Sequence, residues 1–316
     1  MLSCRIKWNV AFSSSIKLGH WSGGSICSNV FHSRRHVSDE ERQDKKFFLT
    51  TAINYTNGNP HVGHAYEALV SDIIARYHRI YGREVFFLTG TDEHGQKIAQ
   101  KATSEGLTPQ ELCDENVQKF KALNDMLKIS NDRFIRTTEH AHKQVAQEMF
   151  RRSLEKGDIY FSKYEGWYNP REEAYVTDSN AMKDNYKDPV TGKDYEKHQE
   201  QLYLFRMSKY QKQLVEHLKQ HKDFIRPENV YNHILKRLEE PLRDLCVSRS
   251  KRTLDWGIPL PNDEDHVMYV WFDALTNYLS GIDYFQFQNK RLESFWPCDV
   301  HIIGLGFLKK KKKNLY

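Results

Sequence analysis

Two histidines flank a glycine where the chain passes from a predicted strand into a predicted helix. The sequence there reads Pro60-His61-Val62-Gly63-His64. A helix N-terminus attracts anions because its free backbone N–H groups and the positive end of its dipole point outward. The two imidazole N–H groups can add hydrogen bonds to phosphate oxygens, and Gly63 permits close approach of a nucleotide. Two surface histidines on a loop are the plainer interpretation, but the position between strand and helix favours a phosphate site.

The apolar pattern around this segment predicts the elements that position it. Phe47–Ala52 is a short run of strand-forming residues, which the loop residues Thr56–Pro60 end. A helix is predicted from about Ala65 to Tyr81, because its large apolar residues recur at helical spacing and Gly82 stands where a C-terminal cap belongs. Those apolar residues are Leu69, Ile73, Tyr77 and Ile80.

A second predicted strand brings another loop to the same place. Val85–Leu88 is apolar and runs into Thr89-Gly90-Thr91-Asp92. A strand, a helix and a strand within about 45 residues are typical of a right-handed crossover in a parallel sheet. Ligands bind at the carboxyl ends of such strands. The sequence therefore predicts an α/β fold with both loops at the ligand-binding edge of the sheet.

The rest of the chain alternates between helical and irregular sequence. Residues 105–155 are predicted to be helical, with breaks near Pro109 and Asn131. Between residues 157 and 265 the strands are short, and Tyr, Pro and charged residues dominate, which is typical of an inserted domain. Apolar strand-type sequence returns at Val267–Phe272 and Val300–Gly304.

Composition and charge limit the possible classes of protein. The 316 residues are 39% hydrophobic, an ordinary globular composition. No stretch approaches the roughly 20 apolar residues that a membrane helix needs. The net charge of +5 comes from the two ends, since residues 1–36 hold bases and no acid and residues 309–313 are all lysine. It is therefore no evidence for a nucleic-acid-binding face. The five cysteines form no Cys-x-x-Cys pair, which argues against a disulfide framework and a four-cysteine zinc site.

Several longer segments resemble those of one enzyme family. Thr50–His64 resembles the first signature of the class I aminoacyl-tRNA synthetases. Gly90-Thr-Asp-Glu-His-Gly95 resembles the methionyl-tRNA synthetases, whereas the leucyl, isoleucyl and valyl enzymes carry Trp before the Asp and Leu-Pro after the Gly. Other segments similar to methionyl-tRNA synthetases are Phe134–His140, Gly166–Tyr168, Leu254–Pro259 and Met268–Tyr278. The resemblance implies a Rossmann-like parallel sheet domain interrupted by an inserted α+β connective domain.

The resemblance also implies roles for particular residues. The residues implied to bind ATP are Pro60, His61, Gly63, His64 and Gly304. Of these, His61 and His64 would be catalytic, because charge builds at the α-phosphate in the transition state. The residues implied to bind methionine are Ala52, Ile53, Tyr55, Asp92, Trp271, Ala274 and Tyr278. Asp92 can hold the substrate ammonium group, and the last three lie on one helical face that can enclose a thioether.

Three features of the sequence qualify this comparison. Family members more often have Pro where this chain has Leu275. Phe205–Tyr210 looks like the second class I signature, but it lies upstream of Trp271 and inside the insert, so we expect it to begin a structural helix. Gly166–Glu173 lacks the cysteines that many family members use for zinc, and we therefore expect no structural zinc.

The resemblance divides the chain into five expected parts. They are a transit peptide or disordered segment (1–45), the first half of the catalytic domain (46–156), the zinc-free connective insert (157–265), an incomplete second half (266–308) and a lysine-rich tail (309–316). The Ser-rich, acid-free residues 1–36 are typical of organellar targeting. They favour the mitochondrial matrix over plastid or cytoplasm, while a basic tail with no destination is the alternative.

The family continues past the strand at Val300–Gly304 with a Lys-Asp-Ile segment, a flexible lysine loop and an anticodon-binding helical domain. This chain instead runs into five lysines and stops. We therefore expect a C-terminally truncated synthetase with little or no activity, with a genuine short isoform as the alternative.

The function implied by the resemblance is that of a methionine–tRNA ligase in translation. Methionine would be activated with ATP and passed to tRNA(Met), with Mg²⁺ arriving on the ATP phosphates rather than in its own protein site. The expected partners are methionine, ATP and tRNA(Met), with no membrane. A different nucleotidyltransferase with the His-x-Gly-His pattern and a non-catalytic binding fragment are the alternatives that the sequence leaves open.

Overall fold

A computed structural model describes residues 8–9, 45–169, 171, 174–176, 178–285, 292 and 294–303. The helices are α1 (Val62–Ile80), α2 (Gln96–Glu105), α3 (Pro109–Met126), α4 (His140–Glu155), α5 (Asp178–Lys183), α6 (Met207–Gln220), α7 (Glu228–Arg237) and α8 (Val270–Ser280). The strands are β1 (Trp8–Asn9), β2 (Lys46–Thr51), β3 (Asn54–Tyr55), β4 (Glu84–Asp92), β5 (Arg133–Arg136), β6 (Ile159–Asn169), β7 (Ala174–Val176), β8 (Glu196–Phe205), β9 (Ile225–Arg226), β10 (Leu245–Cys246), β11 (Ser248–Ser250), β12 (Pro259–Leu260), β13 (Asp263–Met268) and β14 (Val300–Ile302).

A parallel sheet forms the centre of the molecule and confirms the predicted α/β fold class. Its strand order is β3-β4-β2-β14-β1-β9, with β5 paired to β4, and each pairing is parallel. Between β2 and β4 the chain passes through α1, as the crossover pattern predicts. The two-residue strands β1 and β9 extend the sheet beyond β14, which the sequence does not predict.

Alternate residues of the central strands supply the two faces of this sheet. Phe47 and Phe87 face α1 and pack with Ala75, whereas Phe48 and Leu88 lie on the opposite face in the cluster that includes Ile282. Full burial of a side chain of this size contributes about 1.5–3 kcal/mol. Because both faces are apolar, β2 reads as a continuous apolar run rather than an alternating one.

Helix α1 begins slightly earlier than predicted. The face that it buries is not the face that carries its large apolar residues. It runs from Val62 to Ile80, and Gly82 follows with φ 82°, in the left-handed region that favours glycine. Ser71 and Ala75 are buried, whereas Ile73 is 66% exposed and Ile80 81%. The apolar spacing therefore locates the helix but not its buried face.

One local prediction is wrong, and one strand was not predicted. The strand predicted at Val267–Phe272 ends at Met268, because Tyr269 is the N-cap of helix α8, which runs from Val270 to Ser280. The predicted break near Asn131 is confirmed by the end of α3 and the start of α4, and it contains a four-residue strand, β5, which the sequence does not predict. Gly90 makes that pairing possible, since a Cβ there would lie 2.1 Å from the Ile135 carbonyl oxygen.

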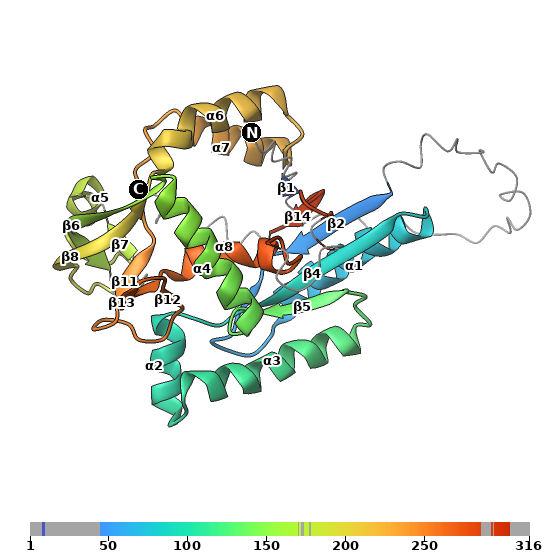
Figure 1. Cartoon of the computed structure of the whole chain (residues 1–316), viewed down its shortest axis with the longest axis horizontal. Coiled ribbons are helices and arrows are strands. Elements are labelled where there is room, and N and C mark those ends of the chain that lie inside the picture. The colour runs from blue at the N-terminus through green and yellow to red at the C-terminus, as the bar shows by residue number, and fades with distance from the viewer. Residues whose placement is uncertain are drawn as a thin grey trace, which may run out of the picture.

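The region between β5 and β14 adds two small antiparallel sheets. Their orders are β10-β8-β6-β7 and β11-β13-β12. Figure 1 shows the first of them at one end of the molecule and α1 with β2 at the other, with α4 and α8 between. Phe150 of α4 packs in the same cluster as Ile159 and Ile258 and so joins these sheets to the centre. The placement of the insert at 157–265 stays a prediction.

The segment that looks like a second class I signature begins a helix, as predicted. Arg206 is the N-cap of α6, and the next residues are tied to carboxylates nearby. The Ser208 hydroxyl donates to Asp244 (2.7 Å), and the Lys209 ammonium lies 2.5 Å from Asp158. No described helix is long and apolar enough to cross a membrane.

Candidate active site

The carboxyl ends of neighbouring strands bring residues from separate motifs together. The Ala52 N–H, just after β2, donates to the carbonyl of Ile302 at the end of β14 (2.9 Å). Tyr55 of β3 pairs with Asp92 at the end of β4, and the Thr56 N–H donates to the Asp92 carbonyl (3.1 Å). The ends of parallel strands share one edge of a sheet, so Ala52, Tyr55 and Asp92 of the predicted methionine residues lie along that edge.

His61 and His64 close the first turn of α1. The Nδ1 atom of His61 accepts from the Gly63 N–H (3.0 Å), and Nδ1 of His64 accepts from the His61 N–H (3.1 Å). A neutral imidazole whose Nδ1 accepts carries its hydrogen on Nε2, so each ring keeps one N–H donor beyond the cap.

The two rings stack with centroids 3.8 Å apart. Burial, together with the charge of His61, lowers the pKa of His64 to about 4. The His64 ring is therefore neutral at pH 7. The segment offers N–H donors at a helix N-terminus, where anion binding is favoured.

The structure gives a steric reason for glycine at position 63 that the sequence does not reveal. A Cβ at this position would lie 2.8 Å from Cε1 and 3.0 Å from Nδ1 of His61. At that distance the imidazole must move, and the hydrogen bond that caps α1 is disturbed. Gly63 makes room for His61, and its predicted role in admitting a nucleotide remains a prediction.

Ile53, Asp92 and Tyr278 form the part of the predicted methionine pocket that the structure assembles. Ile53 and Tyr278 pack against the same cluster on one face of the sheet. Burial raises the pKa of Tyr278, and the charge of nearby Asp92 contributes to that rise. A carboxylate beside an aliphatic side chain and an aromatic ring suits a ligand with an ammonium group and an apolar side chain.

The other predicted pocket residues lie around this group with different surroundings. Ala274 is buried in α8, and Trp271 in the first turn of that helix is 36% exposed. Tyr55 packs towards α2 and α3 rather than against Tyr278. Pro60 is half-buried in the loop before α1. The predicted ATP residue Gly304 lies outside the described residues.

His301 is a site residue that the sequence reasoning missed. It is buried in β14, and its Nδ1 lies 2.6 Å from the Thr50 hydroxyl. Its ring meets Tyr278 edge to face, with centroids 4.6 Å apart. The sequence signal that could have identified His301 is a titratable side chain within a short apolar strand, because a buried polar group needs a hydrogen-bond partner.

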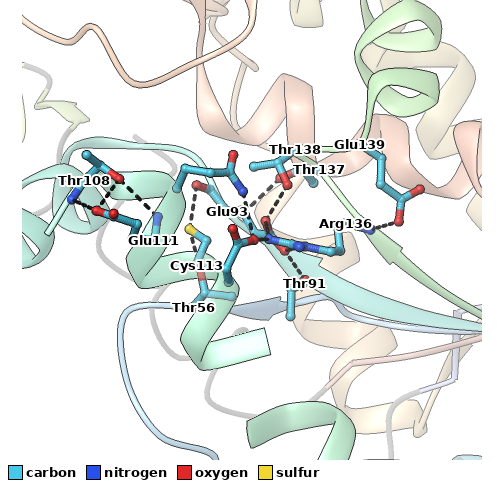
Figure 2. Close-up of polar contacts among 12 residues, drawn as sticks. Thr56, Thr91, Glu93, Thr108, Glu111, Cys113, Arg136, Thr137, Thr138 and Glu139 are labelled. Atoms are coloured by element: carbon cyan, nitrogen blue, oxygen red, sulfur yellow. Dashed lines mark hydrogen bonds and ion pairs between the residues drawn. The ribbon is translucent and has the colours of Figure 1, made fainter. Parts of the chain in front are cut away.

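Glu93, which follows Asp92, is the centre of a buried network that the sequence also did not predict (Figure 2). Its side chain is fully buried. The carboxylate accepts from Nε and Nη2 of Arg136 (both 2.8 Å) and from the hydroxyls of Thr91 (2.5 Å) and Thr138 (2.6 Å). Burial alone would lower the pKa of Arg136, but the bonds to Glu93 raise it.

The backbone of Glu93 is held as firmly as its side chain. Its N–H donates to the Thr137 hydroxyl (2.9 Å), and its carbonyl accepts from Nε1 of Trp256 (2.5 Å). Because a peptide fixed on both sides has little freedom, this network fixes the direction in which the preceding Asp92 leaves β4. Within Gly90–Gly95, Glu93 therefore holds the chain in place, and Asp92 lies at the carboxyl edge of the sheet.

Metal sites do not emerge from the described residues. Within the ranges that the structure covers, no group of three or more His, Cys, Asp or Glu side chains could hold a metal ion. The zinc-free insert remains a prediction, since residues 170, 172 and 173 lie outside those ranges. That Mg²⁺ arrives on the phosphates of ATP also remains a prediction.

Comparisons with known proteins identify the family. The pattern of the family described as tRNA synthetases class I (M) matches residues 47–185 and 181–310. The methionine–tRNA ligase of Rhizobium meliloti (strain 1021) is 44% identical over 270 residues, which are 85% of this chain and 52% of that protein. The chain spans about half the length of this curated relative.

Solved structures show the same likeness in three dimensions. The Mycobacterium tuberculosis methionyl-tRNA synthetase in complex with methionyl-adenylate is 42% identical, with a TM-score of 0.77 over 84% of this chain and 52% of that one. Its free form is 37% identical, with a TM-score of 0.69 over 89% of this chain and 53% of that one. The parallel α/β fold is thus that of the chains it resembles.

Proposed function

This chain belongs to the methionyl-tRNA synthetase family of class I tRNA synthetases, and from that premise we propose that it binds methionine and ATP to form methionyl-adenylate. The observation that carries the proposal is the place of Asp92 at the end of β4, where its charge acts on Tyr278, in a chain whose helix α1 begins with the capping turn of His61 and His64. A relative of the same fold is described with methionyl-adenylate bound.

In this proposal each group has a part in the reaction. Asp92 binds the methionine ammonium group, and Ile53 with Tyr278 contacts the side chain. A carboxylate oxygen of methionine attacks the α-phosphorus of ATP, the new P–O bond forms, and the bond to pyrophosphate breaks. The Nε2–H groups of His61 and His64 donate to phosphate oxygens while charge builds on them. No covalent intermediate with the protein is needed, because orientation and charge stabilisation suffice.

The further partners and steps belong to the same proposal. Mg²⁺ accompanies the ATP phosphates, and no zinc serves the insert. In the second step the ribose hydroxyl at the 3′ end of tRNA(Met) takes the methionyl group and AMP leaves. We place this activity in mitochondrial translation, because residues 1–36 combine five bases and eight serines with no acid.

Two experiments test the function. A calorimetric titration with a non-hydrolysable methionyl-adenylate analogue should show saturable binding, and the leucyl analogue should bind at least 10-fold more weakly. Equal binding of the two analogues would overturn the assignment. Methionine-dependent exchange of pyrophosphate into ATP then measures the chemistry, and selective binding without any exchange would favour the non-catalytic alternative.

A fusion experiment tests the location. A fluorescent protein carrying residues 1–36 should enter mitochondria, because import machinery recognises basic, acid-free segments. The matched control changes Arg34 and Arg35 to Glu. Cytosolic retention of the first fusion, or equal import of both, would contradict the mitochondrial assignment.

A further inference from the structure

A buried carboxylate in α8 joins the elements that surround the methionine pocket. Both oxygens of Asp273 have a histidine partner: Oδ2 lies 2.6 Å from Nδ1 of His94, and Oδ1 lies 2.6 Å from Nε2 of His142. His94 follows β4, and His142 belongs to α4. The other nitrogen of His142 lies 2.7 Å from the hydroxyl of Ser280, which returns the connection to α8.

The chemistry of this group favours a single arrangement. Asp273 and His142 are fully buried, and His94 is 2% exposed. Burial alone would raise the pKa of Asp273, but the charges and hydrogen bonds of His94 and His142 lower it to about 2. An ionised carboxylate only accepts hydrogen bonds, so both rings direct an N–H at it. Removing such a charge leaves its buried partners without their acceptor.

Two sets of polar contacts tie α8 to β5 and to the residues after β4. Near its C-terminus, Nη1 of Arg133 donates to the carbonyls of Ser280 (3.2 Å) and Gly281 (3.0 Å). A Cβ on Gly281 would lie 2.3 Å from Cδ2 of Leu88, so this end sits directly against β4. In the first turn and a half, Asp273 makes the connection to the residues after β4. The first half of α8, which carries Trp271 and Ala274 of the predicted pocket, is therefore held through Asp273.

We propose that Asp273 is a positioning residue for methionine. Asp273 fixes the first half of α8 relative to the end of β4. Ala274 follows it directly in the chain, and Asp92 lies two residues before its partner His94. Asp273 thereby sets the separation between Trp271, in the same half of α8, and the Asp92 carboxylate that receives the ammonium group. This role rests on the proposed function, whereas the coupling of α8 to β4 does not.

The test compares two aspartates that both pair with histidine. Asp273→Asn keeps the shape and removes the charge. Its matched control is Asp263→Asn in the insert, where Oδ2 lies 3.0 Å from Nδ1 of His266 and accepts from the Tyr203 hydroxyl at the same distance. Each variant of the full chain is titrated with L-methionine and, separately, with ATP. Hydrogen–deuterium exchange without ligand then reports on residues 270–280 and 92–96.

The coupling predicts a selective pattern. Asp273→Asn should raise the methionine dissociation constant at least 10-fold, leave ATP affinity within 2-fold, and speed exchange in residues 270–280. Asp263→Asn should do none of these. Unchanged exchange in residues 270–280 of Asp273→Asn would overturn the coupling, and faster exchange with unchanged methionine affinity would overturn the positioning role. If the unaltered chain bound no methionine while Asp273→Asn still exchanged faster, the proposed function would fail and the coupling would stand.

Discussion

Replacing Arg136 by Ala should destabilise the protein far more than its surface position suggests. The arginine makes two bonds of 2.8 Å to Glu93, and the Glu93 side chain is fully buried. Removing one partner of a buried ion pair costs about 3–5 kcal/mol, because the remaining charge is left in the interior. Arg136 is itself 19% exposed, and Thr91 and Thr138 still donate to Glu93. The lower end, about 3 kcal/mol, is therefore expected.

Urea unfolding of the full chain measures this cost. Arg151 provides a matched control, since it pairs with Glu148 at 2.7 Å but is 43% exposed, and an exposed ion pair adds little to stability. Arg136→Lys should fall between the two, because lysine keeps the charge and loses the paired geometry. If Arg136→Ala cost no more than Arg151→Ala, the view of Glu93 as a buried anchor of the site would be wrong.

Four other substitutions test the site and the fold. Gly63→Ala should push the His61 ring from its capping position and lower the rate of methionine-dependent pyrophosphate exchange about 10²-fold, with methionine affinity unchanged. The pKa of His64 is lowered from 6.5 to about 4, so the unfolded chain binds more protons between these values. The free energies of unfolding of the unaltered chain and of His64→Gln should therefore be compared at pH 7 and pH 5. The difference in favour of the unaltered chain should be smaller at pH 5. Ile73→Ser should change the free energy of unfolding by less than about 0.5 kcal/mol because Ile73 is exposed, whereas Phe87→Ala in the core should cost about 3–5 kcal/mol.

The sequence predicted the crossover unit well because its signals are local. Phe47–Ala52 and Val85–Leu88 are apolar runs bounded by loop residues, and both form buried strands of a parallel sheet. Gly82 marks the end of α1 because its positive φ is easily reached only by glycine. The position of the His61–His64 turn follows directly from these elements.

Contacts between residues far apart in the chain could not be predicted from the sequence. Asp273 meets His94 across 179 positions and His142 across 131, and no local pattern gives such pairings. Strand β5 is only four residues long, and its place beside β4 depends on the lack of a side chain at Gly90. The same limit applies to α1, where Ile73 fits a helical period equally well whether it faces the sheet or lies outside.

The most direct test of the account is a calorimetric titration of the full chain with L-methionine, alongside its Asp92→Asn variant. A hydrogen bond between the ammonium group and a charged acceptor contributes about 1.5–3 kcal/mol, which corresponds to an affinity ratio of about 10- to 100-fold. The account predicts saturable binding to the unaltered chain and a dissociation constant raised by that factor in Asp92→Asn. Equal affinities, or no binding to either protein, would contradict the assignment of methionine to this edge of the sheet.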